Sequence, residues 1–484
     1  MKKMNLLVMS LVSAAALSFT SCSSNDDLAG NAGQAKVDQF YMTLTIQTPN
    51  SNGTRTVVNK PTVDATAAES DVTSGTFYLV DANNKIVFKK SISKEEWAEK
   101  KIPTQGTNGK TTLQVPVENV TAGTKYSVYF LANSESASPL TDVYTSDLAN
   151  KFAKAYSTAN NFAMFNENDA DVKANSHTVV FTSDNKDANS AAKVSSIINI
   201  ERLTARIDEP KSEASVIKPY AVDATASDEE KKANADAVKA VKGVTLTKYA
   251  ISNVANKTNV MQQWADATTL SIPSDISYFQ PTSEFGTKTL LQNYGYFNAV
   301  TTEEGKEKRN DYVFENNSSD AATSMYFEYT VKLNKEYQDK ADIKDGTFYR
   351  YNKVIYSRIQ DIIDFYKDQK AIFDGKDAKT VVDELKAAKV DPDSEAKLDE
   401  FRKKYDIEVF NEGKTYYVQK IKDQYLGVEN TIQRNSIYLL NVKNIFNVGA
   451  QVPNGGPDDR TLYYLDVEVS VNPWVLNSYD VELK

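Results

Sequence analysis

Few side chains in this chain could carry out acid–base or nucleophilic chemistry. Its 484 residues include one histidine, His177, and one cysteine, Cys22. A Ser-His or Cys-His mechanism would therefore depend on His177 alone, and a structural zinc site made of cysteine and histidine ligands cannot form. His177 stands in a polar stretch next to a β-like segment, which favours a surface or sheet-edge position over a catalytic one.

Two segments, Gly109-Lys110-Thr111 and Gly413-Lys414-Thr415, end as a phosphate-binding loop does. The full motif has a further glycine upstream, so that backbone N–H groups can surround a phosphate. Thr104 and Glu408 occupy that place in the two segments. Neither segment is therefore expected to bind a nucleotide.

The acidic segment that begins at Asn166 resembles a calcium loop in composition only. Its sixth position is Asp171 and its twelfth is His177, where a calcium loop needs glycine and a bidentate glutamate. The 65 acidic residues also single out no pair of glycosidase carboxylates. The sequence thus predicts no catalytic residue, no cofactor and no metal, and it favours binding or assembly over enzyme activity.

The N-terminus has the order of a bacterial export signal. Residues 1–21 form a basic start, a short apolar run and a few small residues, and Cys22 follows at the expected cleavage site. The apolar run is short for a transmembrane helix, which needs about 20 apolar residues. Cys22 resembles the acylated cysteine of a lipoprotein, and Asp26-Asp27 resembles the surface-export signal of Bacteroidetes lipoproteins. The alternative is an unmodified cysteine in a leader.

The composition predicts packed β domains after this leader. The chain is long enough for several domains, and 41% of its residues are hydrophobic. A net charge of −9 argues against nucleic-acid binding, because there is no excess of cations to contact phosphates. Short β-branched and aromatic runs, separated by turn residues, predict one β domain over residues 56–268 and a second over 269–484.

A helical insert is expected in the second domain, at about residues 340–410. Apolar residues recur there at helical spacing in three stripes, and no metal-binding motif lies on those faces. We expect these helices to pack against the β-sandwich. The stripes consist of Ile355, Ile359, Ile362, Ile363 and Tyr366, then of Val381, Val382 and Leu385, and then of Leu398, Phe401 and Tyr405.

Two segments near the ends of the chain alternate between apolar and polar residues, which is the pattern of a half-buried strand. The first has the apolar residues Phe40, Met42, Leu44 and Ile46. Arg55, the first arginine of the chain, follows in a polar stretch of the kind that proteases cut. The second segment lies at about residues 462–484, and its apolar residues are Leu465, Val467, Val469, Val471, Trp474, Tyr479, Val481 and Leu483.

The C-terminal region is the most specific part of the sequence. Arg434-Asn435-Ser436-Ile437-Tyr438 precedes an ending with Trp474 and Tyr479-Asp480-Val481-Glu482. This order resembles the major fimbrial subunits, the fimbrillins of Bacteroidetes type V pili. Upstream segments are similar to the same family, so the resemblance extends over nearly the whole chain outside the helical insert. They are Tyr129–Asn133, Ile200–Arg206 and Ala250–Val254.

The resemblance implies a fold and a maturation route. The fold is mainly β, with two tandem, transthyretin-like β-sandwich domains and the helical insert in the C-terminal domain. The subunit is a lipoprotein precursor in this family, and an Arg-directed protease removes its leader together with the first strand. In this chain the lipidated propeptide would be residues 22–55, cut between Arg55 and Thr56.

Removal of the strand from Phe40 to Ile46 would leave unpaired backbone groups along an apolar trough, and such an edge invites pairing with another chain. A strand from a neighbouring copy could fill it by β-augmentation. The expected donor is the segment at about 462–484. Two alternatives stay open: 462–484 is the last hairpin of its own domain, and 38–47 is a permanent first strand.

The sequence therefore predicts a structural subunit of a surface fimbria that supports adhesion. The expected partners are other copies or related fimbrial subunits, an Arg-specific processing protease, the outer membrane through the lipid, and host or bacterial surface ligands. The alternatives are a fimbrial tip or anchor subunit, or a surface glycan-binding lipoprotein.

Overall fold

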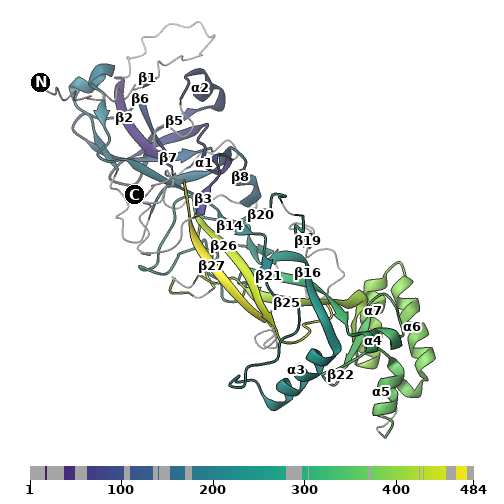
Figure 1. Ribbon diagram of the computed structural model, residues 1–484. Helices are drawn as coiled ribbons and strands as arrows, with labels where there is room; N and C mark the ends of the chain where they lie inside the picture. The colour runs from purple at the N-terminus through teal and green to yellow at the C-terminus, as the bar shows by residue number, and fades with distance from the viewer. Residues whose placement is uncertain are drawn as a thin grey trace, which may run out of the picture. The chain divides into compact units, whose positions relative to one another are not determined.

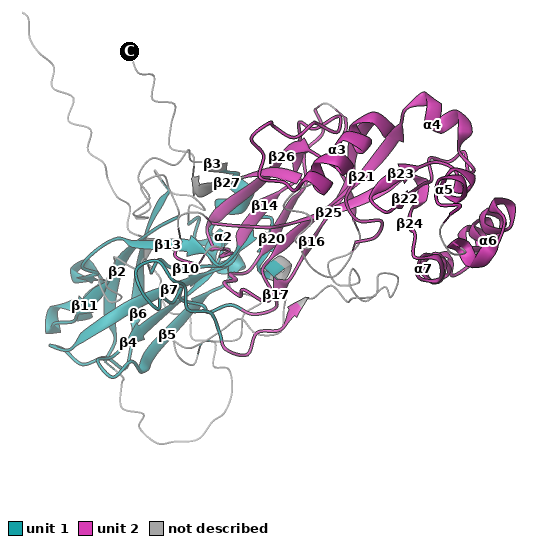
Figure 2. Ribbon diagram, turned by 90° about the horizontal axis from the view of Figure 1, so that it is seen from below, with its two compact units in different colours: residues 1–204, 258–273, 473–484 teal, residues 205–257, 274–472 magenta. Residues whose placement is uncertain are grey.

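The computed structural model describes residues 17–18, 38–48, 63–102, 109–133, 140, 153–168, 177–279, 297–303, 305–368, 372–423, 426–428, 430–453 and 465–476. The chain is mainly β and divides into two compact units (Figure 2). Unit 1 comprises residues 1–204, 258–273 and 473–484, and unit 2 comprises residues 205–257 and 274–472. Among the helices described, none is long and apolar enough to cross a membrane.

Unit 1 is built on one large sheet, whose main path runs β1-β6-β2-β13-β10-β7-β4-β5. Two short strands lie beside this path, since β11 pairs with β7 and β12 pairs with β2. The strands are β1 (Leu17–Ser18), β2 (Phe40–Gln47), β4 (Gly75–Val80), β5 (Ile86–Ile92), β6 (Lys110–Val117), β7 (Lys125–Ala132), β10 (Met164–Asn166), β11 (Thr178–Val180), β12 (Ala192–Lys193) and β13 (Ile198–Arg202).

The unit 1 sheet curls around an aromatic core. Phe181 follows β11 and contacts Phe40 of β2 at 5.6 Å between ring centroids, although β2 and β11 pair with different strands. Phe77 and Phe130 stack at 4.6 Å on β4 and β7. Gly75 is required beside them, because a Cβ at this position would lie 2.2 Å from the Phe130 ring.

Short elements complete unit 1. They lie between the longer strands in the sequence, and β3 pairs with β27 outside the large sheet. Figure 1 labels α1, α2, β3 and β8 among them. They are β3 (Val63–Ala65), α1 (Ala67–Ser70), α2 (Lys94–Glu99), the 3₁₀ turns η1 (Ala153–Tyr156), η2 (Ser183–Lys186) and η3 (Ala188–Ser190), and the hairpin of β8 (Ser157–Thr158) and β9 (Asn161–Phe162).

Unit 2 contains two larger sheets. The first has the order β20-β14-β26-β27 with β15 beside β26, and the second has the order β19-β16-β21-β25. Their strands are β14 (Ala205–Asp208), β15 (Lys211–Ser212), β16 (Val241–Ser252), β19 (Asn298–Ala299), β20 (Asn310–Val313), β21 (Ser324–Leu333), β25 (Lys414–Lys420), β26 (Ser436–Ile445) and β27 (Leu465–Leu476). A separate hairpin pairs β17 (Val254–Ala255) with β18 (Tyr278–Phe279).

Buried tyrosines join these two sheets into a sandwich. The Tyr249 hydroxyl of β16 donates to Asp311 of β20 at 3.0 Å, and the hydroxyls of Tyr329 and Ser212 lie 2.8 Å apart between β21 and β15. Burial raises the pKa of both tyrosines far above the usual range, so each stays a neutral hydrogen-bonding group. The predicted mainly β fold is confirmed.

The predicted helical insert is also confirmed, and it has a core of its own. Its helices lie together at one end of unit 2, next to a small sheet in the order β23-β22-β24 (Figure 1). The stripes expected from the sequence are buried there, among them Ile362, Val381 and Phe401. The elements are α4 (Lys335–Lys340), β22 (Phe348–Tyr351), β23 (Val354–Tyr356), α5 (Ile359–Phe365), η4 (Ile372–Gly375), α6 (Ala378–Val390), α7 (Ser394–Tyr405), β24 (Glu408–Phe410) and η5 (Asn411–Gly413).

The boundary between the units differs from the predicted domain boundary. The chain passes between the units at 204/205, 257/258, 273/274 and 472/473, whereas the composition predicted one boundary at 268/269. The reason is long-range pairing: β14 pairs in parallel with β26, and β16 pairs with β21, so residues 205–257 belong with the C-terminal strands. The charged, alanine-rich stretch before β16, whose composition is that of a solvated loop or a short helix, contains α3 (Asp228–Ala240).

A buried ion pair stabilises unit 2. Arg434 Nη2 lies 2.8 Å from Glu315 Oε2, and the two side chains are 0% and 5% exposed. We expect Glu315→Ala to lower the free energy of unfolding by about 3–5 kcal/mol, because it leaves a buried charge without its partner. Denaturant unfolding of the full chain measures this loss.

The matched control is Glu213→Ala. Glu213 also pairs with a cation, Lys443, but its side chain is 59% exposed. A surface pair adds little to stability, so we expect no resolvable change in the control. Equal losses in the two variants would contradict a special role for the buried pair.

Candidate functional site

Strand β2 is buried along one face over its whole length. The side chains of Phe40, Met42, Leu44 and Ile46 are at most 3% exposed, while the residues between them are partly exposed. The alternation seen in the sequence is therefore the real orientation of the strand. Burial of four such side chains contributes roughly 6–12 kcal/mol before entropy losses are counted.

Strand β2 has neighbours on both sides. It pairs antiparallel with β6 over all eight residues, from Phe40 with Val117 to Gln47 with Lys110. On the other side it pairs in parallel with β12 and β13, so that Met42 faces Ala192 and Ile46 faces Ile198. We call the place between β6 and β12/β13 the β2 slot. A chain without β2 would expose two rows of backbone groups along this slot.

A lysine, Lys186, contacts the chain at the start of β2. Lys186 of η2 lies 2.7 Å from Asp38 and 5.5 Å from the centroid of the Phe40 ring. The Phe40 ring in turn meets Phe181 in an edge-on arrangement. This end of the slot therefore prefers an aromatic ring next to an acidic or polar side chain.

Two further side chains lie next to the outer face of β2, namely Lys193 and Thr112. Lys193 of β12 is the parallel partner of Thr43 and is exposed. Thr45 and Thr112 share a hydrogen bond of 2.9 Å on the same outer face. The alternation identified β2 from the sequence, but Phe181, Lys186 and Lys193 were missed because they come from a segment more than 130 residues further along the chain.

Strand β27 lies in the chain's own sheet beside β26 (Figure 1). Leu465 is buried and Val467 partly buried, whereas Asp466 and Glu468 are exposed. Asn444 donates to Asp466 at 2.9 Å, and Lys443 lies 3.0 Å from Glu468. Hydrogen bonds to Glu213 and then to Glu468 raise the pKa of Lys443, which keeps the cation charged in these contacts.

The end of β27 pairs in parallel with β3, from Trp474 with Val63 to Leu476 with Ala65. Residues 465–476 thus have partners within their own chain. The side chains of Val469, Val471 and Trp474 lie outside the described residues. Tyr479, Val481 and Leu483 also lie outside them, as do Cys22, Arg55 and Thr56.

The residues that carry the family resemblance have structural roles. Arg434 forms the buried pair with Glu315, and the Tyr438 hydroxyl donates to Asp423 at 3.1 Å. Arg202 is fully buried and donates to Ser70 at 2.9 Å. Asn133 adopts a positive φ of 53° and donates to two backbone carbonyls. These contacts give the residues that carry the resemblance structural roles in this chain.

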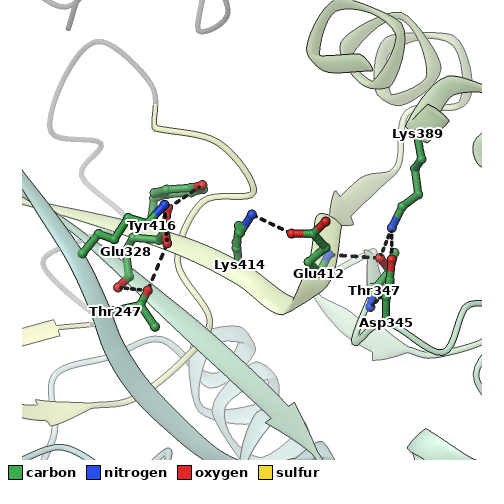
Figure 3. A network of polar contacts seen from close by, with 9 residues as sticks. Thr247, Glu328, Asp345, Thr347, Lys389, Glu412, Lys414 and Tyr416 are labelled. Carbon is green, nitrogen blue, oxygen red and sulfur yellow. Dashed lines mark hydrogen bonds and ion pairs between the residues drawn. The ribbon is translucent and has the colours of Figure 1, made fainter. Parts of the chain in front are cut away.

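A second polar region lies where the insert meets the β21–β25 sheet (Figure 3). Thr347 accepts from Lys389 at 2.7 Å and from the Glu412 backbone at 3.0 Å. Lys389 also pairs with Asp345, and Lys414 pairs with Glu412. A cavity of about 740 Å³ adjoins these residues. Because these charges are paired with one another, the network holds the insert in place.

The remaining sequence candidates behave as structural residues where they are described. His177 lies beside β7, where its carbonyl accepts from Val128, and its Nδ1 is 2.8 Å from the Ser196 hydroxyl. Burial lowers the pKa of His177. Lys110 begins β6 and Lys414 begins β25, so neither follows the strand–loop–helix order of a phosphate loop. No group of three metal-binding side chains occurs within the described ranges.

Residues 408–480 match the sequence model of the C-terminal region of fimbrillin, the major fimbrial subunit protein type IV. This match begins at β24, directly after helix α7 of the insert, and confirms the resemblance inferred from the sequence. No curated protein matches the chain.

Solved structures with a similar chain trace come from the Bacteroidetes. A candidate cell adhesion protein of Parabacteroides distasonis is 12% identical, with a TM-score of 0.46 and coverage of 91% of this chain and 98% of that one. A fimbrilin of Porphyromonas gingivalis is 14% identical, with a TM-score of 0.42 and coverage of 92% and 99%. These similarities are too distant to carry an argument on function.

Proposed function

We propose, from the match of residues 408–480 to the fimbrillin C-terminal model, that the chain is a shaft subunit of a surface fimbria. It would be exported as a lipoprotein acylated on Cys22, cut after Arg55 by an Arg-specific protease, and polymerised by strand exchange. The observation that supports this route best is the position of β2. It is an interior strand of its sheet, yet it is the first long strand among the residues that the structure describes, and it ends eight residues before Arg55.

The β2 slot suits strand exchange on physical grounds. Backbone hydrogen bonds on both sides and four apolar side chains hold β2 in its slot. Another extended segment with alternating apolar residues can supply the same hydrogen bonds and the same apolar contacts. Its one ion pair, between Asp38 and Lys186, is exposed and adds little to stability. No described contact of β2 thus requires this particular segment.

We expect Arg55→Ala to prevent assembly when an Arg-specific protease treats the purified precursor. The uncut precursor keeps β2 covalently attached, so a strand from another copy cannot compete on equal terms. The measurement combines N-terminal sequencing, which should give Thr56 for the unchanged chain, with gels run under mild SDS, which should show a ladder of polymers only for the cut chain.

Arg55→Lys is the matched control. An Arg-specific protease should leave it intact, whereas trypsin should cut it and restore the ladder. Ladders formed by uncut Arg55→Ala protein would rule out cleavage as the trigger. A cleanly cut chain that stays monomeric, or that binds glycans on an array without polymerising, would instead favour the tip, anchor or glycan-binding alternatives.

A further inference from the structure

Strand β27 has neighbours in its own chain, which limits the segments that can be donated. Residues 465–476 pair with β3 at one end, and Asp466 and Glu468 have side-chain partners on β26. Donation of this segment would break those contacts. The eight residues after it, Asn477 to Lys484, complete the chain.

We infer that residues 477–484 of another copy enter the β2 slot in the direction of β2 itself, with Tyr479 in the place of Phe40 and Glu482 beside Lys193. This assignment rests on the proposed function. It makes Phe181, Lys186 and Lys193 the residues that select the donor and set its register.

The first reason is the order of apolar residues. Phe40, Met42 and Leu44 follow one another at every second position of β2, and Tyr479, Val481 and Leu483 do so in the last segment. An aromatic residue comes first in both. In this register Tyr479 would meet the edge of Phe181 and lie below Lys186, as Phe40 does at 5.6 Å and 5.5 Å.

The second reason is charge. Lys193 is the exposed parallel partner of Thr43. The proposed register replaces Thr43 by Glu482, so that a neutral neighbour of Lys193 becomes an acidic one. Opposite charges on neighbouring strands stabilise a pair and like charges destabilise it. At the entrance, Asn477 takes the place of Asp38 and offers Lys186 an amide oxygen.

Shifting the donor by two residues loses both advantages. Tyr479 would then replace Met42, whose side chain is fully buried between Val115 and Ala192, and the tyrosine hydroxyl would have to lose water there. Asn477 would take the place of Phe40 beside Phe181, so a polar side chain would replace the aromatic ring there. A shift by one residue turns the apolar face outward.

Disulfide formation between copies tests this register directly. Cleavage after Arg55 removes Cys22, the only cysteine, so the cut chain is free of background thiols. Neighbouring strands lie about 4.8 Å apart, within reach of a disulfide. We therefore expect Lys193→Cys combined with Glu482→Cys to give ladders that survive boiling without reductant and disappear with reductant.

Two matched pairs serve as controls. Asp480→Cys with Lys193→Cys puts the thiols two residues out of register, with Cα atoms roughly 8 Å apart, and should not link. Glu468→Cys with Lys193→Cys tests donation of β27. Links from Glu468→Cys or Asp480→Cys, or a link within one copy, would overturn the register while ladders in mild SDS uphold the proposed function. Absence of ladders in every variant would defeat the proposed function itself.

Charge reversal gives an independent readout. Lys193→Glu and Glu482→Lys should each slow polymerisation by about two- to five-fold, and the combined variant should recover the original rate. Lys89→Glu, an exposed lysine of β5 at the far edge of the sheet, should leave the rate unchanged. Single variants without effect, or a combined variant that stays slow, would contradict the contact between residues 193 and 482.

Discussion

A chain that ends at Leu476 should fold, be cut after Arg55, and then remain monomeric. The truncation removes only residues 477–484, which follow β27. Strand β27 therefore keeps its pairing with β26 and β3. It removes the three apolar residues proposed to fill the β2 slot of the next copy, which are Tyr479, Val481 and Leu483. Size-exclusion chromatography and mild SDS gels of the cut protein measure the loss of polymers.

The control for this truncation keeps the length of the chain and changes only its apolar face. Val481→Asp with Leu483→Asp should abolish ladders as the truncation does, because each buried carboxylate would lack a partner. Changing Ser478 to Ala should have no effect. Normal polymers from the truncated chain would show that the last eight residues are not the donor, and would direct attention back to β27.

Leu44→Ala should strongly destabilise the precursor, and it should leave the stability of the cut and polymerised chain unchanged. Leu44 is 1% exposed in β2 and faces Leu113, so its truncation leaves a cavity in the core of unit 1. Such substitutions cost about 2–5 kcal/mol. After cleavage and displacement of β2 the residue no longer belongs to the folded body, so the effect vanishes. Denaturant unfolding before and after cleavage measures the difference.

Two further observations sharpen this experiment. The cut sample should be the purified polymer of the full chain, in which the donor has displaced β2 from its slot. Leu113→Ala, on the facing residue of β6, should destabilise both forms, since β6 stays in the body. If Leu44→Ala weakens the cut chain as much as the precursor, the severed β2 remains bound and strand exchange is not the route of assembly.

The same substitution makes a kinetic prediction for the proposed exchange. A β2 strand that is held less tightly leaves its slot more readily, so cut Leu44→Ala protein should polymerise faster than the unchanged chain. Leu113 lines the slot for both the original strand and the donor. Leu113→Ala therefore weakens the binding of both strands and should not speed polymerisation in this way. The comparison of the two variants distinguishes how tightly the slot binds the departing β2 from how tightly it binds the incoming donor.

The sequence by itself determined the local character of the elements that matter most. Alternation over Phe40–Gln47 reflects the two-residue period of a strand, and the insert stripes reflect the period of a helix, so both could be predicted from neighbouring residues. The buried faces of β2 and of α5–α7 agree with those patterns. Cys22 and Arg55 are also visible in the sequence, as the only cysteine and the first arginine.

Only the tertiary structure decided which segments lie next to one another. Thr45 bonds to Thr112 from 67 residues away, Lys193 meets Thr43, and β14 joins β26 across more than 220 residues. One sequence does not specify such pairings, because many strands share the same two-residue period and can pair in many orders. The unit boundary, the internal neighbours of β27 and the lysines beside the β2 slot therefore became known only from the folded chain.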